Sequence, residues 1–517
     1  MKRFIIYIGI AFFLCFMSSC DLLNNSITPP MNLKENDALL SWDKVSKASS
    51  YIVNIEDIVY TVSTNKFDLS ILMDIREYCI KVKAVKNNIE SEWSDIFEYN
   101  PVDKLLELYE YEIVLSNVVI LEYLGKEKDI VIPYGVHVIS SQAFINRTFV
   151  ESVYIPLSVI EIGLGAFSGC TNLNRISIPF VGGSKINTEE YFHFGYIFGE
   201  EFYEDGQYID SLFRYYIPLS LETVEVYAEE IYALNFIDCI SLKNIILSDN
   251  IERIGSSAFQ GCYNLEYIYL PKCLKTIEQM AFAGCENLNN IVLPFGLEFI
   301  ESSCFAYCYN LEEIILPNSL LKLGSSVFLF CTSLTSIIIP DSVIYIMGDY
   351  LFGGCTNLTS ITIPYINETF GKLFERGSYY GGEFTYQGTT YYIPKSITTV
   401  VVTLATYFRP NVFMNCKNLV SISLLSAVYL SQYMFFNCES LSNLYLSRQL
   451  YWISSETFSN CISLTKIYIP KSVEIIGPNT FATFDNLIIY CEVDSLPSSW
   501  DLNWNPNNML VIWGYTE

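Results

Sequence analysis

From Leu242 to Leu358 the chain repeats one pattern five times, and residues 265–287 show a single copy, LEYIYLPKCLKTIEQMAFAGCEN. Successive copies are 23 residues apart four times and then 24 residues apart. A pattern that recurs every 20 to 50 residues is typical of stacked units, each of which buries its apolar side only against its neighbours. The sequence therefore predicts a solenoid. The recurring positions are Leu242, Leu265, Leu288, Leu311, Leu334 and Leu358; Cys239, Cys262, Cys285, Cys308, Cys331 and Cys355; and Phe259, Phe282, Phe305, Phe328 and Phe352.

Each copy contains a short segment in which apolar and outward-facing residues alternate. Because side chains alternate along a strand, Ile268 and Leu270 would face the interior, and Tyr267 and Tyr269 would face outward. Pro271 would end the strand, since proline cannot donate to a continuing ladder. The remaining residues return the chain to its starting side every 23 residues.

Another copy, residues 155–173, reads IPLSVIEIGLGAFSGCTNL. It resembles the BspA-like branch of the leucine-rich repeat superfamily. The resemblance implies a mainly β fold: a leucine-rich repeat solenoid of about fourteen turns. It does not identify a ligand, because function depends on sites placed on a fold.

The repeats are expected to occupy residues 129–486, between an N-terminal cap at 101–128 and a C-terminal cap at 487–517. Terminal units need an atypical cover over the exposed edge of their core. Residues 111–123 look like a hairpin that turns at Ser116-Asn117. The last segment carries Trp500, Trp504 and Trp513 and is similar to the closing segment of BspA-like arrays. These tryptophans could instead form a carbohydrate-binding platform.

Two inserts, residues 180–214 and 365–390, interrupt the array. They share the opening FGxxF, and the chain resumes with YYIPLSLETV after the first and YYIPKSITTV after the second. Because insertions in repeat arrays map to loops that often bind partners, their aromatic residues are candidate ligand contacts. The first insert is also rich in carboxylates, but their spacing fits no calcium loop, and the second insert repeats the aromatic residues without that density of carboxylates, which argues against glycosidase chemistry. The candidate residues are Tyr191, Phe194, Tyr196, Phe198, Phe370, Phe374, Tyr379 and Tyr380.

Residues 1–19 look like a bacterial export signal, with two basic residues before an apolar run that is too short to span a membrane. Two serines precede Cys20 and resemble a lipobox, in which case the lipidated Cys20 would anchor the chain to a membrane through a tether at residues 20–27. Met17 departs from the usual leucine of that motif. The alternative is an ordinary cleaved signal followed by an incidental cysteine.

Residues 28–100 contain short alternating runs at the spacing of a β-sandwich. The segment resembles a fibronectin type III domain through LSW at 40–42, YCIKVKAV at 78–85 and SEWS at 91–94, and its last strand is expected near Trp93. Trp42 and Tyr78 would then be core residues. We expect this domain to act as a spacer, and the chain contains no Arg-Gly-Asp tripeptide that would indicate integrin binding.

The chain has 517 residues, a hydrophobic content of 51% and a formal charge of −26, which becomes −28 without Lys2 and Arg3. Such a negative charge argues against nucleic acid and anionic membrane surfaces as partners. We interpret it as a source of solubility, or as an attraction for basic partners.

Ten of the sixteen cysteines occupy one repeat position, which predicts a buried ladder of reduced thiols rather than a disulfide framework. Cys304 and Cys308 form a C-x3-C pair, but the repeat explains both positions, so no metal site or cofactor is expected. The chain has only two histidines, His137 and His193, and no recognisable catalytic motif, so we expect no enzyme activity. The ten ladder positions are Cys170, Cys239, Cys262, Cys285, Cys308, Cys331, Cys355, Cys416, Cys438 and Cys461.

The outward-facing strand residues form a candidate binding surface, a ribbon about 65 Å long if fourteen strands lie about 4.8 Å apart. Its central part is apolar, and a contiguous exposed apolar strip is typical of a protein interface. The alternative is that strands simply favour such residues. The candidate partner-binding residues are Ile246, Tyr267, Tyr269, Val292, Ile315, Ile338 and Thr362, in a ribbon that also includes Val131, Tyr154, Ser177, Ser423, Tyr445 and Tyr468.

Three functions remain open from the sequence. The resemblance to BspA-like adhesins implies a lipid-anchored protein of the bacterial cell envelope, exposed at the surface, that binds a protein or glycoprotein, such as one of a host matrix. The aromatic inserts suggest a carbohydrate-binding protein instead. A structural scaffold in the envelope is the third possibility.

Overall fold

The computed structural model describes residues 27–36, 39–56, 58–69, 72, 78–99, 108–115, 117–185, 193–209, 214–347, 349–366, 369–374, 381–386 and 389–516. The chain divides into two compact units, Met1–Leu105 and Leu106–Glu517. The predicted export signal and the predicted lipidation site, Cys20, lie outside the described residues.

The N-terminal unit contains small antiparallel sheets around one apolar core. β1 (Lys34–Asn36), β2 (Leu39–Ser41) and β5 (Lys66–Asp68) form one sheet. β4 (Ile58–Val62), β3 (Ser50–Ile55), β6 (Tyr78–Lys86), β7 (Ile89–Glu90) and β8 (Phe97–Tyr99) form the other. Alternate residues of the longer strands are buried, as the period of two requires.

The core of this unit includes Trp42 and Tyr78, which are 3% and 4% exposed, as expected for core residues. The last strand does not lie near Trp93. There, the hydroxyl groups of Ser91 and Ser94 accept hydrogen bonds from the backbone of β6, and the final strand, β8, begins only at Phe97.

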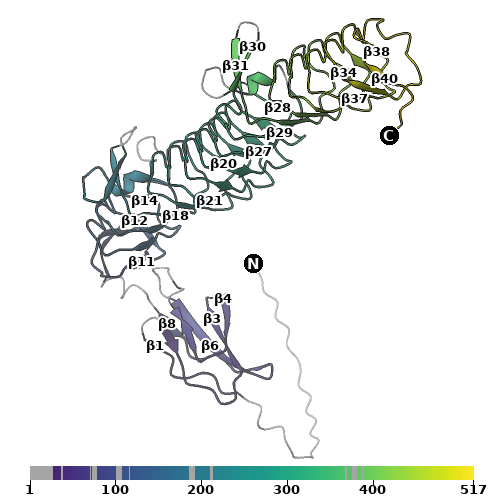
Figure 1. Cartoon of the computed structure of the whole chain (residues 1–517). Coiled ribbons are helices and arrows are strands. Elements are labelled where there is room, and N and C mark those ends of the chain that lie inside the picture. The colour runs from purple at the N-terminus through teal and green to yellow at the C-terminus, as the bar shows by residue number, and fades with distance from the viewer. Residues whose placement is uncertain are drawn as a thin grey trace, which may run out of the picture. The chain divides into compact units, whose positions relative to one another are not determined.

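The second unit is a solenoid in which successive turns contribute neighbouring parallel strands (Figure 1). The described residues hold sixteen strands on one face, the first sheet, rather than the expected fourteen or so. The last two strands fall in residues 487–517, where the cysteine and phenylalanine pattern has ended but strand alternation continues. The strands of the first sheet are β11 (Asp129–Val131), β13 (Ser152–Tyr154), β15 (Arg175–Ile178), β18 (Thr223–Val226), β19 (Asn244–Leu247), β21 (Tyr267–Tyr269), β23 (Asn290–Ile291), β25 (Glu313–Ile314), β27 (Ser336–Ile338), β29 (Ser360–Ile363), β32 (Thr399–Val402), β33 (Ser421–Leu424), β35 (Asn443–Tyr445), β37 (Lys466–Ile469), β39 (Ile488–Cys491) and β40 (Leu510–Ile512).

A second face carries shorter strands from the returning segments. They pair in parallel from turn to turn, for example Ile277 with Ile300. This second sheet contains β12 (Val136–Ile139), β14 (Glu161–Ile162), β20 (Arg253–Ile254), β22 (Thr276–Ile277), β24 (Phe299–Ile300), β26 (Lys322–Leu323), β28 (Tyr345–Ile346), β34 (Tyr429–Leu430), β36 (Trp452–Ile453) and β38 (Ile475–Ile476).

One buried phenylalanine per regular turn stacks on the phenylalanine of the next turn. Phe282 and Phe305, for example, lie 5.6 Å apart between ring centroids with an angle of 5° between their planes. We call this column the phenylalanine spine. Its rings are Phe144, Phe167, Phe198, Phe194, Phe236, Phe259, Phe282, Phe305, Phe328, Phe352, Phe374, Phe370, Phe413, Phe435, Phe458 and Phe481.

The cysteine ladder is buried beside this spine, as the repeat position predicts. In eight of its ten members the thiol donates to the carbonyl oxygen of a spine phenylalanine in the preceding turn, at 3.0–3.2 Å. The Cys308 thiol, for instance, donates to Phe282 O. Cysteine at this position thus fills a small apolar space and also satisfies a buried acceptor.

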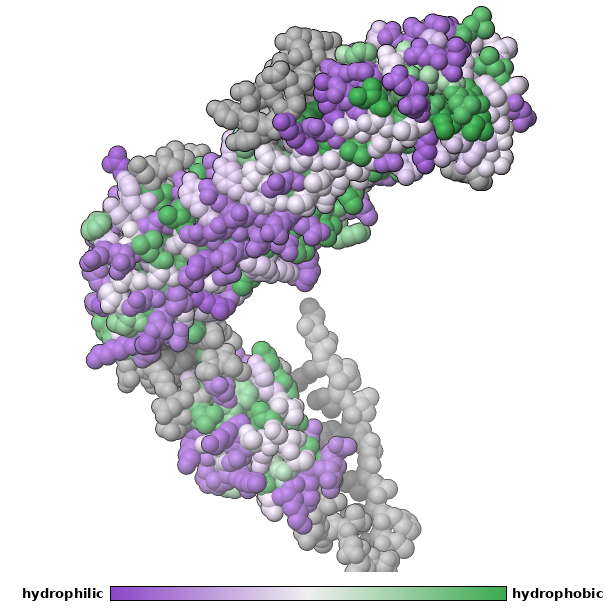
Figure 2. All heavy atoms as spheres, in the orientation of Figure 1, coloured by the Kyte–Doolittle hydropathy of each residue, from purple (hydrophilic) through white to green (hydrophobic). Residues whose placement is uncertain are grey.

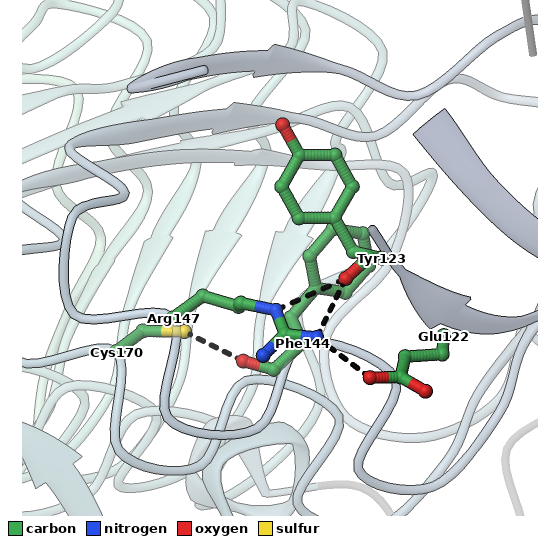
Figure 3. A network of polar contacts seen from close by, with 5 residues as sticks. All are labelled: Glu122, Tyr123, Phe144, Arg147 and Cys170. Atoms are coloured by element: carbon green, nitrogen blue, oxygen red, sulfur yellow. Dashed lines mark hydrogen bonds and ion pairs between the residues drawn. The ribbon is translucent and has the colours of Figure 1, made fainter. Parts of the chain in front are cut away.

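The N-terminal end of the spine is covered by an antiparallel hairpin of β9 (Tyr109–Val114) and β10 (Asn117–Tyr123), as expected. Tyr123 stacks on Phe144 at 5.1 Å. The Arg147 guanidinium donates to Tyr123 O at 2.7 and 3.0 Å and pairs with the Glu122 carboxylate at 2.7 Å (Figure 3). These charge-assisted bonds hold the hairpin against the first turn.

The two inserts contribute phenylalanine rings to the spine, although these residues were expected to contact a ligand. η2 (Phe194–Phe198) places Phe194 and Phe198 between Phe167 and Phe236. η3 (Phe370–Leu373) and the residue after it place Phe370 and Phe374 between Phe352 and Phe413. All four side chains are 0% exposed. Their assignment to ligand binding is therefore wrong, because each insert fills the spine in place of a regular turn.

A hairpin also stands at the end of each insert. β16 (Gly206–Ile209) pairs with β17 (Tyr215–Pro218), and β30 (Gly381–Tyr386) pairs with β31 (Thr389–Pro394). Tyr196 is half-buried. Tyr191, Tyr379 and Tyr380 lie outside the described residues.

At the C-terminal end, Trp504 packs edge-on against Phe481, the last ring of the spine, at 5.6 Å. Trp500 and Trp504 are 3% and 5% exposed. Trp513 contacts both of them. Trp500 and Trp504 are therefore too buried to offer a flat platform to a sugar.

Candidate functional site

The predicted partner-binding residues lie on the outer side of the first sheet. Strand pairing places Ile246 beside Tyr269 and Ile338 beside Thr362. The pairing of β23 with β25 continues to bring Val292 beside Ile315. We call Ile246, Tyr269, Val292, Ile315, Ile338 and Thr362 the apolar strip. Tyr267 lies on the same face, two residues before Tyr269, and is exposed.

Exposure is greatest in the middle of the apolar strip. Val292, Ile315 and Ile338 are 75%, 73% and 67% exposed, whereas Ile246 is only 38% exposed. Phe295, which follows β23, is 81% exposed and widens the apolar surface. Three consecutive turns therefore present large apolar side chains to solvent.

Polar groups border this surface. Glu266, Glu312 and Glu313 are exposed at the beginning of the strands, beside the apolar residues. Together with a chain charge of −26, they make the border acidic. Such a border favours a basic partner and disfavours an acidic one.

The strip ends toward the N-terminus at a polar cluster that sequence reasoning missed. Glu225 occupies the same row as Ile246 and pairs with Arg175. It also accepts hydrogen bonds from Ser177 at 2.8 Å and from Tyr227 at 3.0 Å. Burial alone would raise the pKa of Glu225, but the hydrogen bonds outweigh it and hold the pKa below its ordinary value. The cluster is thus a fixed ionised group at the boundary of the strip.

The described residues offer few groups for catalysis. His193 is buried at the start of η2, where Nδ1 accepts from Gly195 N at 2.8 Å and Nε2 lies 3.1 Å from Ile237 O. Burial lowers its pKa to about 4, so the ring is neutral at physiological pH. In the described part of the chain no group of three or more His, Cys, Asp or Glu residues could hold a metal ion. Cys304 and Cys308 are both buried in the repeat core.

Within the described ranges, no helix has both the length and the apolar character needed to cross a membrane.

The repeat identifies the family. The model for the BspA type leucine rich repeat region matches residues 122–197, 209–332, 322–379 and 406–496, more than half of the chain. The chain belongs to the BspA-type leucine-rich repeat family. No curated protein matches it.

Several solved structures are similar to this BspA-type chain. A leucine-rich repeat protein from Bacteroides ovatus is 26% identical over 76% of this chain and 88% of its own, with a TM-score of 0.36. A leucine rich cell surface protein from Faecalibacterium prausnitzii is 20% identical over 79% of this chain and 94% of its own, with a TM-score of 0.26. The pneumococcal vaccine antigen PcpA is 15% identical over 78% of this chain and 83% of its own, with a TM-score of 0.20. Membership of the family rests on the repeat match.

Proposed function

We propose that this protein is a non-catalytic, surface-anchored binding protein whose apolar strip captures a protein or glycoprotein partner. The observation that carries the proposal is the exposure of Val292, Ile315 and Ile338 on three consecutive turns. Strand propensity explains why such residues occur in strands, but it does not require them to be this exposed in a row. Leucine-rich repeat arrays use surfaces of this kind to bind partners.

The acidic residues at the border of the apolar strip indicate which charge the partner should carry. Glu312 and Glu313 are exposed just before Ile315 in the chain, so the partner should present an apolar stretch with basic residues beside it. Affinity would then come from burial of apolar area, and the charges would set orientation and association rate.

A double substitution in the strip tests the proposal. The purified full chain is assayed by surface plasmon resonance against a panel of purified extracellular matrix proteins and glycoproteins. We expect Ile315→Asp together with Ile338→Asp to weaken binding at least tenfold, because burying two carboxylates in an apolar interface is costly. The matched control is Ile344→Asp, since Ile344 is 59% exposed but lies next to β28 on the second sheet. Retained binding by the double variant, or no binding to the panel by the unsubstituted chain, would exclude the strip as the capture site.

Anchoring is proposed to occur through a lipid on Cys20, with residues 28–100 as a fibronectin type III-like spacer that holds the solenoid away from the membrane. Two antiparallel sheets around a core that contains Trp42 are compatible with such a domain. In a bacterial host supplied with an alkyne-labelled fatty acid, the chain should become labelled and fractionate with membranes. Cys20→Ala should abolish both effects, whereas Cys79→Ala should not. Equal labelling of the two variants would disprove the anchor.

A further inference from the structure

Three tyrosines and one carboxylate gather where the chain leads from the second sheet back to the first, on three consecutive turns of the solenoid. Tyr263, Glu286 and Tyr309 each follow a ladder cysteine directly, so they hold the same position in their turns. Backbone hydrogen bonds join these turns: Asn287 N donates to Tyr263 O at 3.0 Å, and Asn310 N donates to Glu286 O at 3.2 Å. Glu286 therefore lies between the two tyrosines in one row.

Tyr307 adds a third ring beside this row. Its centroid lies 6.3 Å from that of Tyr309, and the two rings meet edge-on. Phe330 of the following turn stacks on Tyr307 at 5.3 Å. The preceding turn has Gly284 at this position, and a Cβ there would lie 3.7 Å from Cε1 of Tyr263. Gly284 thus puts no side chain between the Tyr263 and Tyr307 rings.

The position of Tyr307 and Phe330 is a costly one for an aromatic residue. Both have a left-handed backbone conformation, with φ of 63° and 58°. Eight of the ten ladder cysteines follow a glycine, asparagine or aspartate, which adopt this conformation more easily. Strained residues of this kind tend to occur at functional sites. Two adjacent turns accept the strain and thereby place a pair of stacked rings beside Tyr309.

The Glu286 carboxylate has no cation beside it. Residues 276–321 contain no lysine or arginine, and within the described part of the chain no hydrogen bond or ion pair involves this carboxylate. Glu439 holds the same position in a later turn, and there Lys417 of the preceding turn pairs with it at 2.7 Å. Where Glu439 has a lysine, Glu286 has Tyr263. A cation supplied by a ligand can take the place that the lysine fills.

The four side chains are near enough to act on one another and remain accessible. Burial raises the pKa of Tyr309, and Glu286, Tyr307 and Tyr263 raise that pKa further. Glu286 and Tyr309 are half-buried, whereas Tyr263 and Tyr307 are 45% and 41% exposed. A ligand can therefore reach the rings, and the carboxylate is partly shielded from water.

The rings distinguish this site from the rest of the acidic surface. Hydrophilic residues cover much of the face of the solenoid that Figure 2 shows, in keeping with the charge of −26. Such a surface attracts every small cation to a similar degree. Aromatic faces in addition attract a cation that contacts them closely, and this favours organic cations with apolar substituents.

We propose that this tyrosine cluster, Tyr263, Tyr307 and Tyr309 with Glu286, binds a quaternary ammonium group. The methyl groups contact the rings, and the carboxylate provides the opposite charge. A trimethylammonium group has no N–H that needs an acceptor. It therefore loses less on leaving water than the strongly hydrated ammonium of lysine. The proposal is independent of protein capture by the apolar strip.

The test is an NMR titration of the full chain with choline, phosphocholine and an amide of acetylated trimethyllysine, followed by saturation transfer to the N-methyl signals. Dimethylbutanol, in which carbon replaces the nitrogen of choline, is the neutral counterpart. We expect choline to bind about tenfold or more tightly than dimethylbutanol. A preference for trimethyllysine would identify a modified protein as the source of the group, and a preference for phosphocholine would identify a headgroup.

Glu286→Gln keeps the shape of the side chain but removes its charge, and should weaken choline binding about tenfold. Tyr309→Leu should weaken it to a similar degree. Tyr309→Phe keeps the ring and should bind nearly as well as the unsubstituted chain, because the attraction comes from the aromatic face. The matched controls are Glu439→Gln, in the same row, and Tyr345→Leu, at a tyrosine that is 61% exposed on β28; both should bind choline normally.

Three results would overturn the proposal: no saturation transfer to any of the three cations, equal binding of choline and dimethylbutanol, or undiminished binding by Glu286→Gln. Ile315→Asp, in the apolar strip, should leave choline binding unchanged. Cation binding and protein capture can therefore fail separately.

Discussion

Replacing Phe305 with alanine is expected to lower the free energy of unfolding by about 3–5 kcal/mol, the usual cost of removing a fully buried aromatic side chain. Phe305 is 0% exposed and stacks between Phe282 at 5.6 Å and Phe328 at 6.1 Å. Its loss leaves a cavity and interrupts the phenylalanine spine midway. Because each turn of a solenoid contacts only its neighbours, the array has no other core to compensate.

Urea-induced unfolding followed by circular dichroism measures this effect. Phe295→Ala is the control, since Phe295 is 81% exposed and its removal should change the free energy of unfolding by less than about 0.5 kcal/mol. A Phe305→Ala protein with the stability of the control would mean that the spine does not hold the turns together.

Stability should also fall steeply in alkaline solution, because the cysteine ladder is protonated in the folded state. Burial raises the pKa of Cys308 to about 12. Burial is also the main reason why the pKa values of Cys170 and Cys355 are raised to about 12. An unfolded thiol titrates near pH 8.5. The thiol's contribution is therefore fully present below about pH 8.5 and is lost as pH rises toward 12, since the unfolded state releases protons that the folded state retains.

Each such thiol should lower the free energy of unfolding by about 1.4 kcal/mol per pH unit in this window. The measurement is urea unfolding under reducing conditions between pH 7 and 11. Cys308→Ala should reduce the slope of this decline by about 1.4 kcal/mol per pH unit. The packing lost with the smaller side chain should lower the free energy of unfolding equally at every pH, so it does not change the slope. Cys273→Ala, at an exposed cysteine, should leave the slope unchanged. Identical slopes for the two variants would show that Cys308 ionises in the folded protein.

The regular part of this fold could be predicted from the sequence because every regular turn buries apolar side chains at the same positions. Alternation fixes which strand residues face the interior, so Ile268 is buried and Tyr267 is exposed. The position of the candidate strip follows from the same rule. The exposed fraction of each residue in the strip does not follow from alternation, since Val292 is 75% exposed but Ile246, in the same row, is 38% exposed.

The remaining features depend on contacts between distant residues. Phe194 and Phe370 lie outside the 23-residue period, so they resembled loop aromatics, although both complete the spine. The turns that contain β39 and β40 lack a cysteine and a phenylalanine at the repeat positions, so their sequence favours a cap over a repeat. Pairing along the first sheet is interrupted between β21 and β23, between β25 and β27 and between β35 and β37, and the alternating sequence of these strands gives no sign of the interruptions.

The inserts change the ratio of spine rings to strands in the solenoid. β15 pairs directly with β18, yet Phe198 and Phe194 stand between the spine rings of the same two turns. β29 and β32 are likewise adjacent while Phe374 and Phe370 intervene. Each insert thus adds two rings to the phenylalanine spine without adding a strand to the first sheet, and the two inserts bracket the strands from β18 to β29, which carry the proposed partner-binding strip.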